Sequence, residues 1–271
     1  MYPLRKNLVI RDVWIGISVM LLMACHTVPV TGRSQMIFID EPQEIALGLA
    51  SYKDALSKSK LSKNQTETQR VRRVGQRIAT VVDRSDYDWE FNLIDDDRTI
   101  NAFALPGGKV AVYTGLLSIA KGDAALATVL SHEIAHAMAR HGGERMTTGL
   151  LAEMGRAILD ASLAAGVKDP NMIKAYQSAY GIGAQLGVLL PFNRKQESEA
   201  DHIGLILMAR AGYDPAEASQ FWRRMAALDQ QKPPEWLSTH PSDETRIRQL
   251  EEWLPEAKSD YLATRSDSSS H

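Results

Sequence analysis

The feature of this sequence that most constrains its fold is an apolar helical segment that contains three ionisable side chains. Apolar residues recur with helical spacing from Asp123 to His141, and Gly142-Gly143 follow as a stop signal. His132, Glu133 and His136 stand inside this run. Unpaired polar groups would be costly in a helix of this composition, which counts against a chance arrangement. The segment therefore predicts a largely apolar helix that carries a polar site.

The spacing of these three residues predicts a metal site suited to hydrolysis. Histidines at positions i and i+4 share one face of a helix, so both imidazoles can bind one ion. Glu133 is offset around the helix, so its carboxylate can reach a water at that ion without replacing it. Zinc lowers the pKa of such a water and polarises a scissile carbonyl, while a carboxylate passes the proton to the leaving amine. We expect His132 and His136 to bind one Zn²⁺ per chain, with Glu133 as general base.

A second acidic segment supplies the rest of the predicted site. Catalytic zinc takes three protein ligands and leaves one position open. Glu197 and Asp201 stand at positions i and i+4, on one helical face. We expect Glu197 to be the third ligand and Asp201 to hold the far nitrogen of a ligating histidine. Glu199 points elsewhere by helical geometry and is expected on a solvated face, and His202 is expected to be structural or at the surface.

Around this site the sequence predicts a mainly α-helical fold with a small β-sheet, of the α+β class. Trp89, Phe91 and Leu93 alternate with polar residues, as on a half-buried strand. A second strand is expected over Lys109–Tyr113, after a Pro-Gly turn. Helices are expected from Asp40, from a Thr66–Gln69 capping box, over residues 123–141, 145–165 and 171–190, around residues 197–208, and after Asp214-Pro215.

The N-terminal residues indicate an export signal followed by a lipid attachment site. Positive residues precede a compact apolar stretch over residues 13–24, which suits a signal-peptide core, whereas a spanning helix needs about 20 residues. The sequence Leu22–Cys25 resembles a lipobox, with cleavage before Cys25 and a lipid on its thiol; an uncleaved anchor is the alternative. The expected organisation is a signal peptide over residues 1–24, a tether over 25–40, a metallopeptidase domain over 41–257 and a disordered tail over 258–271.

Charge and cysteine content narrow the expected partners and location. The formal net charge of −2 gives no reason to expect nucleic acid. Cys25 is the sole cysteine, so an intramolecular disulfide cannot form. His26, not Asp, follows Cys25, so the bacterial rule for retention at the inner membrane is not met. The expectation is therefore a lipid anchor in the bacterial outer membrane, facing the periplasm.

Four motifs occur in the chain: Asn101-Ala102-Phe103-Ala104 with Pro106-Gly107-Gly108, His132-Glu133-x-x-His136, Glu197-x-x-Ala200-Asp201, and His240-Pro241-Ser242 with Arg246. In this order they resemble the motifs of the gluzincin metallopeptidases that include the CAAX prenyl proteases and HtpX-like heat-shock proteases. The resemblance covers roughly residues 43–254. Those two branches carry several transmembrane helices, which this sequence lacks, and the chain is more similar to the periplasmic lipoprotein branch represented by LoiP.

The resemblance implies a zincin-type domain and roles for the two outer motifs. It implies that Asn101, Ala102, Phe103 and Ala104 form an edge strand beside the metal, along which an extended substrate peptide lies. The same residues would also make an ordinary hairpin. His240 is similar to a histidine near the zinc that either stabilises the oxyanion or occupies the open position and keeps the enzyme latent. Arg246 is expected near the ligands, with its role open.

The expected function is that of a zinc-dependent endopeptidase, membrane-anchored and facing the periplasm, that degrades unfolded or misassembled envelope proteins. The substrate class follows only from the resemblance, as does an expected association with outer-membrane assembly machinery. An alternative is a zinc-stabilised chaperone or assembly factor for outer-membrane proteins with little or latent proteolysis, although the intact Glu133 counts against it. A lipoprotein scaffold that binds metal incidentally would leave Glu197 and Asp201 unexplained.

Overall fold

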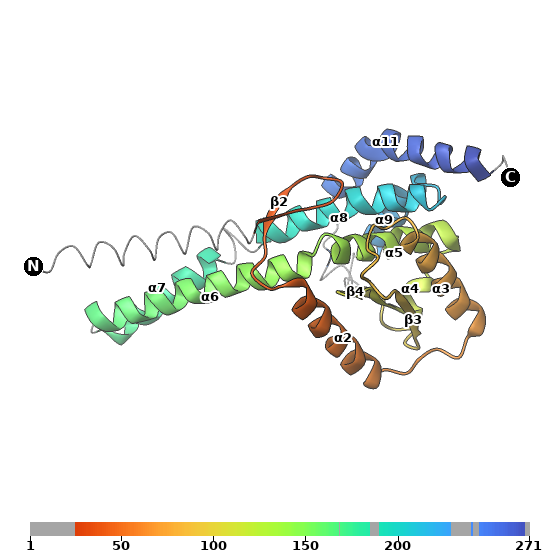
Figure 1. Ribbon diagram of the computed structural model, residues 1–271. Coiled ribbons are helices and arrows are strands. Elements are labelled where there is room, and N and C mark those ends of the chain that lie inside the picture. Colours follow the sequence, from red (N-terminus) through yellow and green to blue (C-terminus); the bar gives the residue numbers. More distant parts are fainter. Residues whose placement is uncertain (1–24, 168, 185–189, 229–239, 241–243, 269–271) are drawn as a thin grey trace, which may run out of the picture.

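The computed structural model describes residues 25–167, 169–184, 190–228, 240 and 244–268 (Figure 1). The predicted signal peptide over residues 1–24 lies outside the described residues, as do Pro241 and Ser242 of the fourth motif. Within the described part, helices predominate and the sheets are small, so the predicted mainly α-helical α+β class is confirmed.

Helix α5 (Gly122–Met138) lies at the centre of the molecule. Every residue from Ala125 to Met138 is buried, including the two histidines and the glutamate of the first motif. The helix ends before the predicted His141 because Arg140 takes a left-handed conformation, with φ 55°. Gly142-Gly143 are therefore not a stop signal: they lie in the first turn of the next helix, α6 (His141–Gly166).

Helix α8 (Leu190–Arg210) packs along α5 and carries the second acidic segment. The two backbones approach closely at Gly204, where an added Cβ would lie 3.0 Å from the backbone nitrogen of His132. Such a contact is tighter than nine in ten real Cβ contacts, so a larger residue would push the two backbones apart by a few tenths of an ångström. The packing of α8 at Gly204 thus sets how near its acidic residues come to the histidines of α5.

One sheet lies beside α5 and has the strand order β3-β5-β4. Strands β3 (Glu90–Ile94) and β5 (Lys109–Tyr113) pair in parallel, which confirms the two predicted strands. Strand β4 (Ala102–Leu105) pairs antiparallel with β5 and occupies an edge of this sheet. It also packs against α5, so this edge lies next to the helix that carries the histidines.

Two N-terminal helices cover the sheet, and both begin near their predicted starts. Helix α2 (Glu41–Ser57) is capped by Asp40, whose side chain accepts from the backbone N–H of Gln43. Helix α3 (Gln65–Ala79) is capped by Asn64, not by the predicted Thr66–Gln69 box. The predicted apolar face of α3 is buried, with Val71, Val74 and Ile78 in the main core.

The segment predicted to be a tether contains a short hairpin of strands β1 (Cys25–Thr27) and β2 (Ser34–Met36). The hairpin packs on the protein: Val28 enters the main core and the side chain of Gln35 donates to the backbone oxygen of Ala139 at 2.8 Å. Beside it, α6 continues into a helical hairpin with α7 (Pro170–Ala184), which projects from the body in Figure 1.

The C-terminal part completes the cover over α8. Helix α9 (Ala216–Ala227) follows Asp214-Pro215 as predicted, and α11 (Glu244–Ser268) packs along α8. The predicted disordered tail from Lys258 is not observed over the described residues, because α11 continues to Ser268. Its continuation is held by contacts with α8, such as the Arg210–Asp260 ion pair at 2.7 Å. Across the described ranges, no helix combines the length and apolar character needed to cross a membrane.

The buried hydroxyl of Tyr52 on α2 provides a test of this packing. It donates to the backbone oxygen of Val110 at 2.9 Å and accepts from Asn92 at 3.1 Å, and burial raises the pKa of Tyr52 to about 12. Tyr52→Phe should lower the free energy of unfolding by about 1–3 kcal/mol at neutral pH, because two buried polar groups lose a partner.

The difference in unfolding free energy between wild type and Tyr52→Phe should shrink as the pH rises from 10 to 12. In that range the unfolded chain ionises Tyr52 while the folded chain keeps it neutral, which removes stability from the wild type alone. Urea titrations of both proteins at pH 8, 10 and 11.5 measure the effect. A constant difference across this range would contradict a raised pKa.

Candidate metal centre

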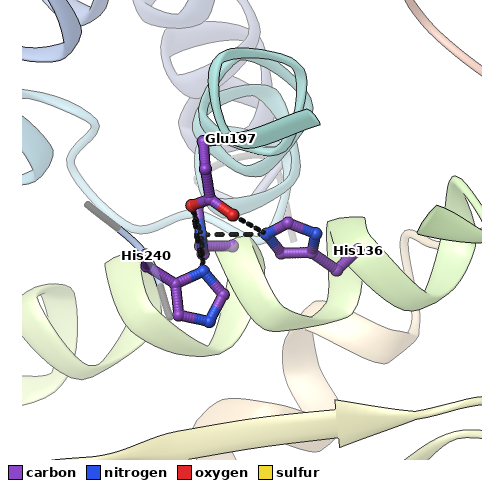
Figure 2. Close-up of side chains that lie close together, drawn as sticks. His136, Glu197 and His240 are labelled. Atoms are coloured by element: carbon purple, nitrogen blue, oxygen red, sulfur yellow. Dashed lines mark hydrogen bonds and ion pairs between the residues drawn. The ribbon is translucent and has the colours of Figure 1, made fainter. Parts of the chain in front are cut away.

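Four buried side chains bring potential metal-binding atoms together between α5 and α8. His132, His136, Glu197 and His240 each offer one atom, and these atoms all lie within 4.8 Å of one another. His132 Nε2 and His136 Nε2 are 3.2 Å apart, and each lies 3.3 Å from an oxygen of Glu197. Figure 2 shows Glu197 reaching from its helix toward His136, with His240 on its other side, 2.9 Å from Glu197.

The orientation of His132 is fixed from behind by Asp201. His132 Nδ1 lies 3.0 Å from Asp201 Oδ1, which leaves Nε2 directed at the ligand cluster. Arg246 holds Asp201 through two hydrogen bonds of 2.6 and 2.7 Å, and its guanidinium lies 3.8 Å from the ring centroid of Trp222. The structure therefore places Asp201 and Arg246 around the ligand cluster, Asp201 against the far nitrogen of His132 as expected from the sequence.

The donor set fits zinc. Two imidazole nitrogens and one carboxylate are ligands that catalytic zinc sites use, and the convergence of their atoms in a buried space is what one ion would require. The hydrogen bond between Asp201 and His132 is the outer contact that such ligands usually have. His240 is a fourth candidate, placed where it can reach either the ion or a group bound to it.

Burial and mutual charge set the protonation of the cluster. Burial lowers the pKa of His136 well below its usual value, which keeps its ring neutral. Burial opposes ionisation of Glu197, but electrostatic attraction to the ring of His136 and hydrogen bonds from the surrounding histidines outweigh it, and they hold the pKa of Glu197 well below its usual range. For His132, burial is outweighed by Asp201 and Glu197, which raise its pKa to about 9. A metal ion must therefore displace a proton from His132 at neutral pH.

Glu133 lies beside the ligand atoms but is not one of the four converging groups. It is buried on α5, and its Oε1 is 3.4 Å from Nε2 of His240. Neighbouring residues on α5 thus present two histidines to Glu197 and one carboxylate to His240. This arrangement separates the residues that can bind a metal from the one that can move a proton.

The expectation that Glu199 lies on a solvated face is wrong. Glu199 is 7% exposed and its Oε2 lies 3.0 Å from His141 Nε2. Arg33 Nε donates to the same oxygen at 2.8 Å, and the hydroxyl of Thr31 donates to Oε1. Burial alone would raise the pKa of Glu199, but these hydrogen bonds lower it to about 2. Glu199 does point away from Glu197, as helical geometry predicts, but the face that it occupies is covered by the N-terminal hairpin.

Three other residues singled out in the sequence, His202, Cys25 and Asn101, lie outside the ligand cluster. His202 stacks on Trp253 at 4.5 Å between ring centroids and lies 3.0 Å from Glu256, in keeping with a structural histidine. Cys25 is exposed at the start of β1, and nothing in the fold tests its lipidation. Asn101 precedes β4, and its side chain accepts from the backbone N–H of Ala102 at 2.8 Å.

Sequence reasoning missed three residues behind the ligands. These are His141, which contacts His136, and Arg33 and Glu144, which pair with each other, Arg33 also holding Glu199; all three are buried or nearly so. His141 has no place in the helical pattern of α5, because the chain leaves that helix at Arg140. A charged Arg33 in a segment of tether-like composition gave no local signal for a partner on a distant helix.

A family model described as Peptidase family M48 matches residues 65–254. The mitochondrial metalloendopeptidase OMA1 of Schizosaccharomyces pombe is 39% identical over 240 residues, which cover 85% of this chain and 67% of the relative. Metalloendopeptidase OMA1 of Homo sapiens is 31% identical, with 84% of this chain and 46% of the relative covered. The beta-barrel assembly-enhancing protease of Escherichia coli is 29% identical, with 90% and 51% covered, so the chain spans about half the length of these last two relatives.

These similarities overturn the expected location in the bacterial outer membrane at its periplasmic face. Relatives from two yeasts, a plant and human are named as mitochondrial proteins. The prediction rested on a short terminal motif that a sorting machinery reads, and not on any property of the folded domain.

Asp201→Asn tests the support behind His132. The amide removes the negative charge that His132 and Arg246 share, so zinc affinity should fall about 10- to 100-fold while the fold is kept. Competition with a chromophoric chelator measures the affinity. Asp260→Asn is the matched control, because Asp260 pairs with Arg210, the last residue of α8 and far along that helix from Glu197, and it should bind zinc as the wild type does. Equal affinities in the two variants would show that Asp201 has no such role.

Proposed function

The chain belongs to peptidase family M48 and is a zinc metalloendopeptidase, and from this premise we propose that His132, His136 and Glu197 hold the zinc while Glu133 acts as general base. The observation that carries the proposal is the convergence of the three ligand atoms in a buried space, with the carboxylate of Glu133 on the same helix. Neither half of the site is sufficient alone, because α5 supplies the histidines and α8 supplies Glu197.

Each side chain has a distinct part in the proposed reaction. When bound, zinc supplies a Lewis acid that activates a water and polarises the scissile carbonyl. Glu133 takes a proton from the attacking water and delivers it to the leaving amine, so it is needed for cleavage but not for metal binding. Burial of the cluster strengthens these electrostatic interactions by excluding bulk water.

His240 has two proposed roles with opposite effects on activity. Its Nδ1 lies 2.9 Å from Glu197 and its Nε2 lies 3.4 Å from Glu133, so it stands between the ligand and the base. As a donor it would stabilise the oxyanion of the transition state. As a fourth ligand it would close the open position and keep the enzyme latent.

We propose that substrates are extended polypeptide segments that pair with β4. Phe103 and Leu105 lie in the register that faces Ala111 and Lys109 of β5, and the backbone of Tyr113 donates to Asn101. In an antiparallel ladder the alternate residues turn their N–H and C=O groups away from the partner strand, which here means Ala102 and Ala104. Backbone pairing at Ala104 would hold a peptide beside α5 with little demand on its sequence.

Such recognition favours unfolded or misassembled proteins as substrates, because folded proteins rarely expose a free extended segment. The narrower predictions stay predictions: envelope proteins as the natural substrates, the lipid on Cys25, and the branch of the family represented by LoiP. The name of the E. coli relative refers to β-barrel assembly, which supports the second candidate, an assembly factor with latent proteolysis. The position of His240 inside the ligand cluster favours latency in either case.

Glu133→Gln separates catalysis from metal binding. The variant should keep one zinc per chain and lose cleavage of casein by about 100-fold or more, because the amide cannot accept the proton. Zinc content is measured by atomic absorption and cleavage by peptide release. Equal cleavage by variant and wild type would refute the assignment of the base.

Two companion variants complete this experiment. Glu197→Ala should lose zinc, and full zinc content in that variant would count against the third ligand. His240→Ala distinguishes the two roles of His240, since a gain of cleavage indicates latency and a loss indicates stabilisation of the oxyanion.

Ala104→Pro tests substrate pairing at the sheet edge. Proline removes the N–H that points away from β5 and leaves the β4–β5 ladder intact, as is tolerated on edge strands. We expect KM for an unfolded substrate to rise about tenfold with zinc content unchanged. Ala104→Ser is the matched control because it keeps the N–H and should retain the wild-type KM. Identical KM values for the proline and serine variants would argue against pairing at this residue.

A further inference from the structure

The ligand His136 has a partner behind it, as His132 does, but that partner is a second histidine. His136 Nδ1 lies 2.8 Å from Nδ1 of His141, at the start of α6. His141 is completely buried, and its other nitrogen lies 3.0 Å from Glu199 Oε2. The two rings meet edge to face, with 4.9 Å between their centroids. His141 is therefore a buried histidine with both ring nitrogens in hydrogen-bond contact.

The direction of these hydrogen bonds follows from the need of His136 to present a lone pair to the metal. Its Nε2 lies among the ligand atoms, so the ring proton must sit on Nδ1. Nδ1 of His141 then accepts a hydrogen bond from that N–H, and Nε2 of His141 must donate to Glu199. A carboxylate at the end is the group that fixes this sequence, because it accepts hydrogen bonds without donating one.

Glu199 is in turn held by the hairpin of β1 and β2. Arg33 contacts its Oε2 with Nε at 2.8 Å and with Nη2 at 2.7 Å, and Thr31 donates to its other oxygen. The same guanidinium pairs with both oxygens of Glu144 at 2.6 and 2.7 Å. Arg33 thus balances two buried carboxylates, and its side chain is only 13% exposed.

The turn between α5 and α6 places His141 beside His136. Arg140 has a positive φ of 55°, which turns the backbone sharply between α5 and α6. Glu44 holds the turn by accepting from Arg140 Nε at 2.8 Å and from the backbone N–H of Gly143 at 3.2 Å. A Cβ at Gly143 would lie 3.0 Å from the Glu44 carboxylate, so a larger residue would require the Glu44 side chain to shift.

We propose that His141 and Glu199 are positioning residues for the metal ligand His136, and that Arg33 makes the N-terminal hairpin part of the metal centre. We call Arg33, Glu199 and His141 the His141 relay. This inference rests on the proposed function, in that His136 is taken as a zinc ligand. It gives the two histidine ligands matching supports, since Asp201 and Arg246 hold His132 while Glu199 and Arg33 hold His136 through His141.

The test measures zinc affinity of the full chain, apart from any cleavage. Zn²⁺ is titrated into metal-depleted protein in competition with a chromophoric chelator. His141→Phe keeps the ring and removes both nitrogen contacts, so zinc affinity should fall about 10- to 100-fold. The zinc affinity of Arg33→Ala should fall less, by about three- to tenfold, because this variant loosens Glu199 without removing it. His202→Phe is the matched control: His202 lies on α8, as Glu199 does, but contacts Glu256 and Trp253, so the zinc affinity of this variant should not change.

A spectroscopic measurement separates positioning from a general loss of packing. Co²⁺ in place of zinc gives a visible absorption spectrum that reports ligand geometry. His141→Phe and Arg33→Ala should change that spectrum, whereas His202→Phe should leave it as in the wild type.

The possible outcomes distinguish the inference from the function on which it rests. Wild-type affinity and an unaltered Co²⁺ spectrum in folded His141→Phe would overturn the His141 relay while leaving the zinc centre in place. If circular dichroism shows that His141→Phe does not fold, Arg33→Ala decides by the same two measurements. Wild-type protein that takes up no zinc would contradict both the relay and the metal centre.

Discussion

The contact of α8 with α5 at Gly204 is the constraint on which the rest of this structure depends. It brings the helix backbones close enough for Glu197 to meet His132 and His136, and it places Asp201 behind His132. The burial of α5 follows from the same requirement, because a helix that shares its polar groups with α8 must be covered on its remaining faces by α3, α9 and the sheet. The edge strand β4 is thereby carried to the side of α5, where it can hold a peptide.

The balance of charge around the cluster explains how so many ionisable groups are buried together. An uncompensated carboxylate in the interior would be strongly destabilising, whereas one that is paired and hydrogen-bonded is tolerated. Asp201 is compensated by Arg246, and Glu199 by Arg33. The Asp201–Arg246 pair contacts the ligand His132 directly, whereas the Glu199–Arg33 pair reaches the ligand His136 through His141.

Much of the site could be predicted from the sequence because its residues stand at positions i and i+4 of a helix. The pairs His132–His136 and Glu197–Asp201 each lie on one helical face, so their convergence needs only that two helices pack. Glu199 was misjudged because spacing gives the direction of a side chain and not what covers it, and the cover is a hairpin more than 160 residues away in sequence. The contact of His141 with His136 could not be predicted, because the left-handed conformation of Arg140 ends the helical spacing before His141. The tail of α11 was taken as disordered on composition, although its contacts with α8 keep it helical.

The residues around the metal centre lie far apart in the sequence, so a newly made chain acquires them one after another. Arg33, His136, Glu197 and Arg246 come from four separate parts of the sequence, and long-range contacts form only after the segments that make them exist. The first histidines leave the ribosome long before Glu197, and Arg246 follows later still. A nascent chain therefore completes the proposed metal centre and its supports only after α11 has been made and has packed on α8.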